Sequence, residues 1–297
     1  MDLADLHIFK TVVEQGGVVK AARQLHRVQS NVTTRIKQLE ASLGTQLFYR
    51  DRQRLVLSPS GELLLSYAER LLRLSEEARH AMSGSTPRGV LRVGALESTT
   101  ASRLPALLAE YHVRHPEVRI ELQTGTNDGL TAAVLARRVD AAFIAESPPS
   151  EELSSLPLFA ERLVLITSLK HRKVRGPGDV EGDSIIAFPH GCAYRRRLQR
   201  WLGQDRTPAP RVLDLGSYHA IVACVASGAG IALVPESVLQ TLAAAQVQCH
   251  RLPREHSHVV TPLVWRSGEL SPALMALQSL LKDVVAFKRT GNAGATL

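Results

Sequence analysis

Residues 24–40, QLHRVQSNVTTRIKQLE, decide how the N-terminal part of this 297-residue chain folds. Val32, Ile36 and Leu39 recur at helical spacing, which predicts one amphipathic helix with a buried stripe. The opposite face carries short hydrogen-bonding side chains of middling or poor helix propensity, at Ser30, Asn31, Thr33 and Thr34. Because stability alone would favour Glu, Lys and Ala there, the pattern indicates that this face has another purpose.

The positive charge of the chain is concentrated around this helix. The net charge is +8 with a pI of about 9.7, although charged residues make up only 22% of the chain. Residues 18–54 hold eight Lys or Arg against two acidic residues, Glu40 and Asp51, and so carry six of the eight net charges. Such a patch is the expected footprint of phosphate binding, although a solvated basic surface is the alternative.

The neighbouring segments complete a small module. Apolar spacing predicts one helix before Gly16–Gly17 and a short second helix over residues 18–25. Residues 47–58, LFYRDRQRLVLS, predict two short strands around a turn that carries three arginines. Two helices with a tight connection, followed by a basic hairpin, are typical of a winged helix-turn-helix domain, which we place at residues 1–58.

A long helix follows this module. Ser58–Pro59 is a favourable helix start, and the residues after it predict a helix of roughly 24 residues, or about 36 Å. Its apolar residues form one seam: Leu64, Tyr67, Leu71, Leu74, Ala78 and Ala81. The seam predicts pairing with a second copy of the chain, and the alternative is a helix packed on its own domain. Residues 83–89, SGSTPRG, indicate a hinge, so residues 59–89 form the linker.

Beyond the hinge, strands and helices alternate, which predicts an α/β fold. The alternation occurs twice, with a Ser/Pro stretch at residues 147–157 between the two series, and predicts two lobes with parallel strands. We expect lobe I to comprise about residues 90–161 and 266–297, and lobe II about residues 162–265. Two crossings between the lobes would leave a cleft between them.

Four loops before predicted helices are the candidate ligand-binding elements of this cleft. Their candidate effector-binding residues are Ser98, Thr99, Thr100, Asn127, Cys192 and Ser217. For any single loop, helix capping alone is the better explanation, and only the four loops together favour a ligand site. Hydroxyls at helix N-termini favour a small anion, most simply a carboxylate. A neutral aromatic ligand is the main competitor, disfavoured because the chain is only 4% aromatic.

Other chemistries find little support in the sequence. Cys192, at a predicted helix N-terminus, could act as a redox sensor through a lowered thiol pKa, although a packing role is the better interpretation. Residues 249–258 gather one Cys and three His without a zinc-ligand spacing, so we expect neither a metal site nor a cofactor. No catalytic motif is present, and we expect a protein that is not an enzyme.

The sequence also predicts a cytoplasmic location. Three cysteines are too few for a disulfide framework, and the N-terminus, MDLADLHIFK, lacks the basic start and apolar core of a signal peptide. No apolar run reaches the roughly 18 residues that span a bilayer. We therefore expect no membrane partner.

The N-terminal block resembles the LysR-type transcriptional regulators of bacteria. Residues 9–62 follow that family's order of motifs, from AARQL through QSNV and IKQLEASLGTQLFYR to LSPSG. Residues 92–116, RVGALESTTASRLPALLAEYHVRHP, and residues 230–239, GIALVPESVL, are similar to the family's effector domain, a type 2 periplasmic-binding-protein fold. Two sites depart from the family pattern: Val18–Val19, and Val28, which stands where Ser or Thr would cap the helix.

The resemblance implies a sequence-specific DNA-binding regulator of transcription that a small-molecule effector controls. It places the short polar face of residues 29–37 in the DNA major groove and the basic hairpin on flanking phosphates or a narrow minor groove. The implied DNA-binding residues are Gln29, Ser30, Asn31, Thr33, Thr34, Arg35, Lys37, Arg50, Arg52 and Arg54.

The resemblance also implies an assembly. Dimers would form through the linker helix and homotetramers through the effector domains, on double-stranded DNA with a two-fold symmetric operator, with RNA polymerase as a further possible partner. The alternatives on the same scaffold are a solute-binding protein, a redox sensor and an enzyme. A solute-binding protein would not need residues 1–58.

Overall fold

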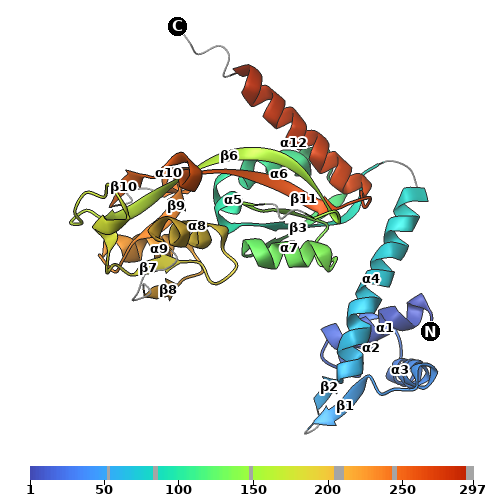
Figure 1. The fold of residues 1–297 in the computed structure, drawn as a ribbon. Coiled ribbons are helices and arrows are strands. Elements are labelled where there is room, and N and C mark those ends of the chain that lie inside the picture. Colours follow the sequence, from blue (N-terminus) through green and yellow to red (C-terminus); the bar gives the residue numbers. More distant parts are fainter. Residues whose placement is uncertain (52–53, 83–85, 147–149, 204–210, 243–245, 292–297) are drawn as a thin grey trace. The chain divides into compact units, whose positions relative to one another are not determined.

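The structure, a computed structural model, describes residues 1–51, 54–82, 86–146, 150–203, 211–242 and 246–291 (Figure 1). It divides into two compact units, residues 1–85 and 86–297, and each unit is described by itself. None of the described helices is both long and apolar enough to cross a membrane.

The first unit is built on three helices. They are α1 (Leu3–Glu14), α2 (Val18–Gln24) and α3 (Gln29–Leu43). Phe9, Val32 and Leu39 are almost fully buried in its core, so the apolar stripe predicted on the quoted segment is confirmed. Helix α3 begins at Gln29, and Val28 is its N-cap without a side-chain capping hydrogen bond.

A hairpin and a long helix complete this unit. They are β1 (Phe48–Asp51), β2 (Arg54–Leu57) and α4 (Pro59–Met82). The two strands pair antiparallel, so the predicted wing is present. The Ser58 hydroxyl accepts a hydrogen bond from the backbone N–H of Gly61 at 3.0 Å and donates one to the carbonyl of Gln46 at 2.6 Å. This cap confirms the predicted helix start and ties it to the segment before the wing.

Lobe I of the second unit is a sheet with helices on both faces. Its elements are β3 (Gly89–Ala95), α5 (Glu97–Ser102), α6 (Leu104–Arg114), β4 (Val118–Thr124), α7 (Asn127–Leu135), β5 (Ala141–Phe143) and α12 (Pro272–Gly291). Leu107 of α6 and Leu277 of α12 share one core with the sheet, whereas Leu130 of α7 belongs to the other. The C-terminal helix thus returns to lobe I, as predicted.

Lobe II contains shorter strands and helices. They are η1 (a 3-10 helix, Pro177–Val180), β7 (Ile185–Ala187), α8 (Ala193–Leu202), β8 (Val212–Asp214), α9 (Tyr218–Ala226), β9 (Ala232–Pro235), α10 (Glu236–Thr241), β10 (Val247–Arg251) and α11 (Arg254–Ser257). The core of this lobe continues into α7 of lobe I, so one set of apolar contacts spans the two lobes.

Two long strands carry the chain between the lobes, β6 (Leu153–Ser168) and β11 (His258–Arg266) (Figure 1). They pair antiparallel with each other, β11 pairs antiparallel with β5, and β6 pairs antiparallel with β9 and β10. Among the described strands, the expectation of parallel pairing holds for β3–β4, β3–β5 and β7–β8. The Ser/Pro stretch at residues 147–157 was expected to separate the two series of strands and helices. Its last part is wrong, because residues 153–157 already belong to strand β6.

Candidate functional sites

The polar face predicted on residues 29–37 is largely open to solvent in α3. Its exposed residues are Gln29, Ser30, Asn31, Thr34 and Lys37. Arg27, in the turn before α3, donates a hydrogen bond from Nη1 to Oδ1 of Asn31 at 3.4 Å. Sequence reasoning counted Arg27 only as part of the basic patch, because the contact depends on the geometry of the turn.

Two residues expected on this face are engaged within the protein. Thr33 is half-buried, and its hydroxyl donates to the carbonyl of Gln29 at 3.0 Å. Arg35 lies against the start of α1, with Nη1 3.2 Å from Oδ1 of Asp5 and Nη2 3.9 Å from Oδ2 of Asp2. Positions i and i+4 share a side of a helix, so Arg35 follows Asn31 along α3, but its guanidinium is turned toward the carboxylates of Asp2 and Asp5. Its expected contact with the DNA backbone has no support in this geometry.

The three wing arginines can be placed only in part. Arg50 and Arg54 belong to β1 and β2, and only their backbone is described. Arg52 lies outside the described residues. Their role at DNA remains a prediction from the sequence.

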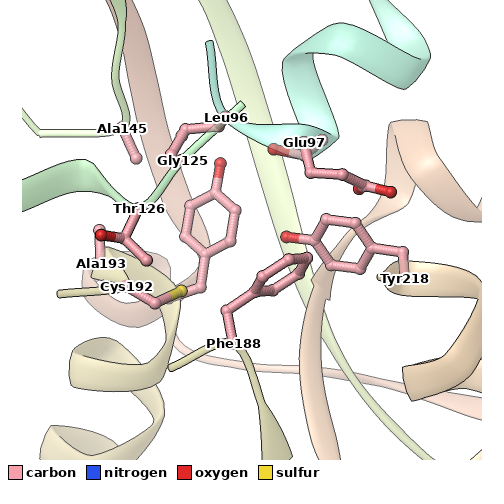
Figure 2. A pocket seen from close by; sticks show the side chains of 11 residues that line it. Leu96, Glu97, Gly125, Thr126, Ala145, Phe188, Cys192, Ala193 and Tyr218 are labelled. Carbon is pink, nitrogen blue, oxygen red and sulfur yellow. The ribbon is translucent and has the colours of Figure 1, made fainter. Parts of the chain in front are cut away.

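A small pocket, partly open to solvent, lies between the two lobes (Figure 2). The segments that follow β3, β4 and β5 contribute one side, and α8 and α9 with the loop before α8 contribute the other. Its eleven lining residues are Leu96, Glu97, Ser98, Gly125, Thr126, Ala145, Phe188, Cys192, Ala193, Tyr194 and Tyr218. The position matches the general rule that α/β sheets bind ligands beyond the carboxyl ends of their strands.

Only two of the six candidate effector-binding residues line this pocket, Ser98 and Cys192. The Thr100 hydroxyl donates to the carbonyl of Leu96 at 3.1 Å, and Thr99 is buried away from the pocket lining. Both residues are therefore placed as parts of the short helix α5 rather than as ligand contacts.

The other two candidates also lie outside the lining. The Asn127 side chain accepts hydrogen bonds from the backbone N–H groups of Ala145 and Glu146 at 2.9 and 3.2 Å, and donates to the carbonyl of Glu146 at 3.1 Å. Ser217 is the half-buried N-cap of α9 and makes no side-chain capping bond. Asn127 thus holds the loop after β5 in place, and Ser217 precedes Tyr218, which does line the pocket.

Aromatic rings line the pocket although the chain is only 4% aromatic. Figure 2 shows the rings of Phe188 and Tyr218 beside each other, with Glu97 near Tyr218. The Phe188 and Tyr218 centroids are 4.9 Å apart in an edge-to-face arrangement at 62°. Tyr194 is a third ring of the lining. The composition argument against an aromatic ligand was therefore wrong, because rings that are rare in the chain are gathered at one place.

Burial keeps the thiol and phenol groups of the pocket neutral. Cys192, the N-cap of α8, is 8% exposed, and burial raises its pKa despite the nearby N–H groups of α8. Burial also raises the pKa of Tyr194 and Tyr218. The lowered thiol pKa expected for a redox sensor is thus contradicted, because desolvation outweighs the helix terminus.

Glu97 is the pocket residue that carries a carboxyl group. Burial raises its pKa, while a hydrogen bond from the Tyr218 backbone and the proximity of His219 act in the opposite direction. Its Oε2 atom is buried and, like the Tyr194 hydroxyl oxygen, has no hydrogen-bond partner among the described residues. Glu97 and Tyr194 both lie in loops that the sequence predicts as ligand-binding elements, residues 97–100 and 189–194, but neither was selected as a candidate binding residue.

The cluster at residues 249–258 does not form a metal site in the described part of the chain. His250 is buried, and its Nε2 lies 2.9 Å from the Thr167 hydroxyl. Cys249 is exposed on the other side of β10. No group of three potential metal-ligating side chains was found among the described residues.

Comparison with known proteins gives the same division of the chain into two parts. Residues 3–62 match the family model of the bacterial regulatory helix-turn-helix protein, lysR family, and residues 84–286 match the LysR substrate binding domain. Two solved structures are similar over the full length. A full-length OxyR variant from Pseudomonas aeruginosa has a TM-score of 0.71 at 20% identity, covering 96% of this chain and 94% of that one. CbnR in complex with its target DNA has a TM-score of 0.68 at 24% identity, covering 95% and 99%.

Curated relatives extend the similarity to whole sequences. The HTH-type transcriptional regulator GltR of Bacillus subtilis (strain 168) is 36% identical over 292 residues, covering 97% of this chain and 99% of the relative. YusT of the same strain, named as an uncharacterized HTH-type transcriptional regulator, is 39% identical over 277 residues, covering 92% and 93%. With both family models matched in the expected order, the chain belongs to the LysR family of DNA-binding transcriptional regulators with an effector-binding domain.

Proposed function

We propose that α3 reads an operator sequence in the DNA major groove through Gln29, Ser30 and Asn31, with Thr34 and Lys37 on the adjoining backbone. The exposed polar face of α3 carries this proposal, because it contributes nothing to the core of the unit. Short polar side chains allow close approach to base edges. The Arg27–Asn31 hydrogen bond adds a positive charge at the start of the face.

We infer that the chain acts as a dimer through α4. Helix α4 packs Leu64, Ala68 and Leu72 on the core of its own unit and leaves another side apolar and exposed. The exposed residues are Leu63 (61%), Tyr67 (49%), Leu71 (39%) and Leu74 (61%), at spacings of four, four and three. Such a face fits a second copy of the same helix better than water. Two copies would place two α3 helices on a two-fold symmetric site, and contacts between effector domains would extend the dimer to a tetramer.

The pocket between the lobes of the second unit is the proposed effector site. It combines an apolar lining with a few buried polar groups, which is typical of small-molecule sites. We infer a regulatory role and no catalysis, because the relatives are regulators and the pocket thiol is protonated. A role at operator DNA would place the protein in the cytoplasm.

Operator binding by alanine variants of α3 tests this proposal. Asn31→Ala should weaken binding to a cognate duplex by about 1–3 kcal/mol, the usual value of a good base contact, and weaken binding to random duplex much less. His7→Ala, which truncates an exposed polar side chain of α1, is the matched control and should change neither. Equal losses on both duplexes for Asn31→Ala would mean that α3 positions the protein without reading sequence.

A further inference from the structure

The pocket between the lobes has no cationic side chain. None of its eleven lining residues is Lys, Arg or His. Cys192, Tyr194 and Tyr218 keep their protons at neutral pH, since burial raises the pKa of each. The lining therefore carries either no charge or the single negative charge of Glu97.

The arginines of α8, beside the pocket, already have carboxylate partners, although Nε of the buried Arg195 has no hydrogen-bond partner among the described residues. Nη1 of Arg195 lies 2.7 Å from Asp214, and Nη1 of Arg196 lies 2.8 Å from Asp128. Nε of Arg197 lies 2.6 Å from Oε1 of Glu146. A ligand carboxylate would have to compete with these pairs for positive charge.

The N-terminus of α7 offers an anion less than the sequence suggests. The pocket residue Thr126 is the N-cap of α7, and its hydroxyl already accepts a hydrogen bond from the N–H of Gly129 at 3.3 Å. The N–H of Asp128 donates to the carbonyl of Gly191 at 3.2 Å, and the Asp128 carboxylate adds a negative charge in the same turn. The partial charge of a helix end is smaller than the full charge of an ionised Glu97.

Two buried oxygen atoms of the pocket lack hydrogen-bond donors. Tyr194 is only 4% exposed, and its hydroxyl has no partner at hydrogen-bond distance among the described residues, although the nearby Ser98 hydroxyl acts to lower its pKa. Oε2 of Glu97 also has no hydrogen-bond partner among the described residues. An ionised carboxylate can only accept hydrogen bonds, and a phenol can accept as well as donate. Buried polar atoms normally have partners, so a ligand with several N–H donors would supply the donors that these atoms lack.

The aromatic rings of the pocket can contact both a cationic group and an apolar body of a ligand. Phe188 and Tyr218 are in edge-to-face contact at 4.9 Å, and both line the pocket together with Leu96 and Ala145. Aromatic rings attract cations, most strongly where water is excluded. The same rings and alkyl groups accommodate a small apolar body.

We propose, building on the effector role proposed above, that this pocket binds a small protonated primary amine. Its ammonium group donates hydrogen bonds to Glu97 and Tyr194, and its apolar body lies against Phe188 and Tyr218. An ammonium beside Glu97 favours the ionised carboxylate and so offsets the effect of burial on that group. This class of ligand is opposite in charge to the carboxylate that the sequence favours.

Three probes of similar shape test the charge preference on the full chain. Benzylamine, benzyl alcohol and benzoate share a ring and differ in the charge of the head group. Isothermal titration of each should show benzylamine binding at least tenfold more tightly than the other two. Glu97→Gln keeps the size of the side chain and should weaken benzylamine at least tenfold, and Tyr194→Phe should weaken it severalfold. Glu117→Gln, which removes an exposed carboxyl group after α6, should leave the affinity unchanged.

The possible results distinguish failure of the amine proposal from failure of the proposed function. Benzoate or benzyl alcohol binding as tightly as benzylamine, absence of benzylamine binding, or full affinity in a folded Glu97→Gln variant would each overturn the amine proposal. Operator binding by the same preparations is measured independently. A preparation that binds its operator selectively but not benzylamine contradicts only the ligand class, whereas loss of selectivity for the operator contradicts the proposed function.

Discussion

Arg35 shows how the partner of a side chain can differ from the one that its sequence neighbours suggest. It follows Thr33 and Thr34 in a polar run and adds to the local positive charge, so the sequence groups it with phosphate-binding residues. In the structure its guanidinium is paired with Asp5, whose side chain is only 11% exposed. Arg35 therefore joins α3 to α1.

Arg35→Ala should accordingly change stability and not DNA binding. The substitution leaves the buried Asp5 carboxylate without its ion pair, which should lower the stability of the first unit by about 1–2 kcal/mol. Chemical denaturation measures this loss. The salt dependence of DNA binding should keep its slope in Arg35→Ala, whereas Lys37→Ala should reduce the slope by about one phosphate contact. A reduced slope in Arg35→Ala would show that Arg35 contacts a DNA phosphate after all.

The raised pKa of Glu97 predicts that the stability of the folded protein depends on pH. Burial raises its pKa above the value of 4.5 that we take for the unfolded chain, so the folded state holds its proton more tightly. As pH rises through 4.5 and then through the raised value, the folded state pays for ionising a buried group and loses stability. Glu97→Gln removes this cost. Thermal unfolding should show Glu97→Gln gaining on the natural protein at pH 7.5 and losing that advantage toward pH 4, and a difference that does not vary with pH would contradict the burial of this carboxyl group.

The pocket residues mark the limit of what the sequence could predict at this scale. The rule that selects polar loops before helices led to two residues that line the pocket, Ser98 and Cys192. The same rule selected Thr100 and Asn127, whose hydrogen bonds are local. Tyr194 and Tyr218 were missed because their convergence depends on how two helices of lobe II are packed.

At the scale of elements, α4 combines two faces on one helix. The turn-by-turn spacing of its apolar residues was readable from the sequence, and so were its start and length. The division into a face for its own unit and a face left exposed required the structure, which buries Ala68 and exposes Leu74.

Charges on the exposed face of α4 should separate the dimer. Replacing Leu71 and Leu74 with Lys puts like charges on the apolar face, where each copy would meet its partner. Sedimentation velocity should show the double variant as a folded monomer. The matched control, Glu69→Lys with Glu76→Lys, adds charge at exposed positions of α4 outside this set of leucines and should remain dimeric. An unchanged assembly in the leucine variant would move the interface elsewhere.

Glycine is required at position 61 because α4 lies very close to Leu47 and Leu57 there. A Cβ atom at this position would lie 2.3 Å from the carbonyl oxygen of Leu47 and 2.9 Å from the Leu57 side chain. Gly61→Ala should therefore destabilise the first unit by about 1–3 kcal/mol. Thermal unfolding checks this, with Gly17→Ala as the control because its Cβ would meet no atom within 4 Å. Equal stability of Gly61→Ala and the natural protein would show that the wing can move away without cost.

The antiparallel pairing of β6 with β11 is a feature of the fold that the hydrophobic pattern of the sequence could not predict. The apolar run of β6 is readable from the sequence, but its pairing with β11 is not. Antiparallel pairing between segments about a hundred positions apart leaves no local signature. The prolines Pro157 and Pro262 face each other next to a register shift, which is where a sheet tolerates residues without an N–H group.

For the whole molecule, the fold classes of both units followed from periodicity, and the family followed from ordered motifs that cover nearly all of the chain. The coupling between ligand and DNA is a property of neither unit alone. A ligand changes operator binding only if it binds one arrangement of the assembly more tightly than another. A ligand that binds all arrangements equally would stabilise the second unit without regulating transcription.

The most direct test of the central claim is selection of binding sites from a pool of random DNA duplexes by the full chain. The account predicts enrichment of a motif with two related half-sites arranged with two-fold symmetry, and loss of that enrichment in Asn31→Ala while binding to random duplex persists. Enrichment of no motif, or of the same motif by Asn31→Ala, would contradict a sequence-specific regulator that reads DNA through α3.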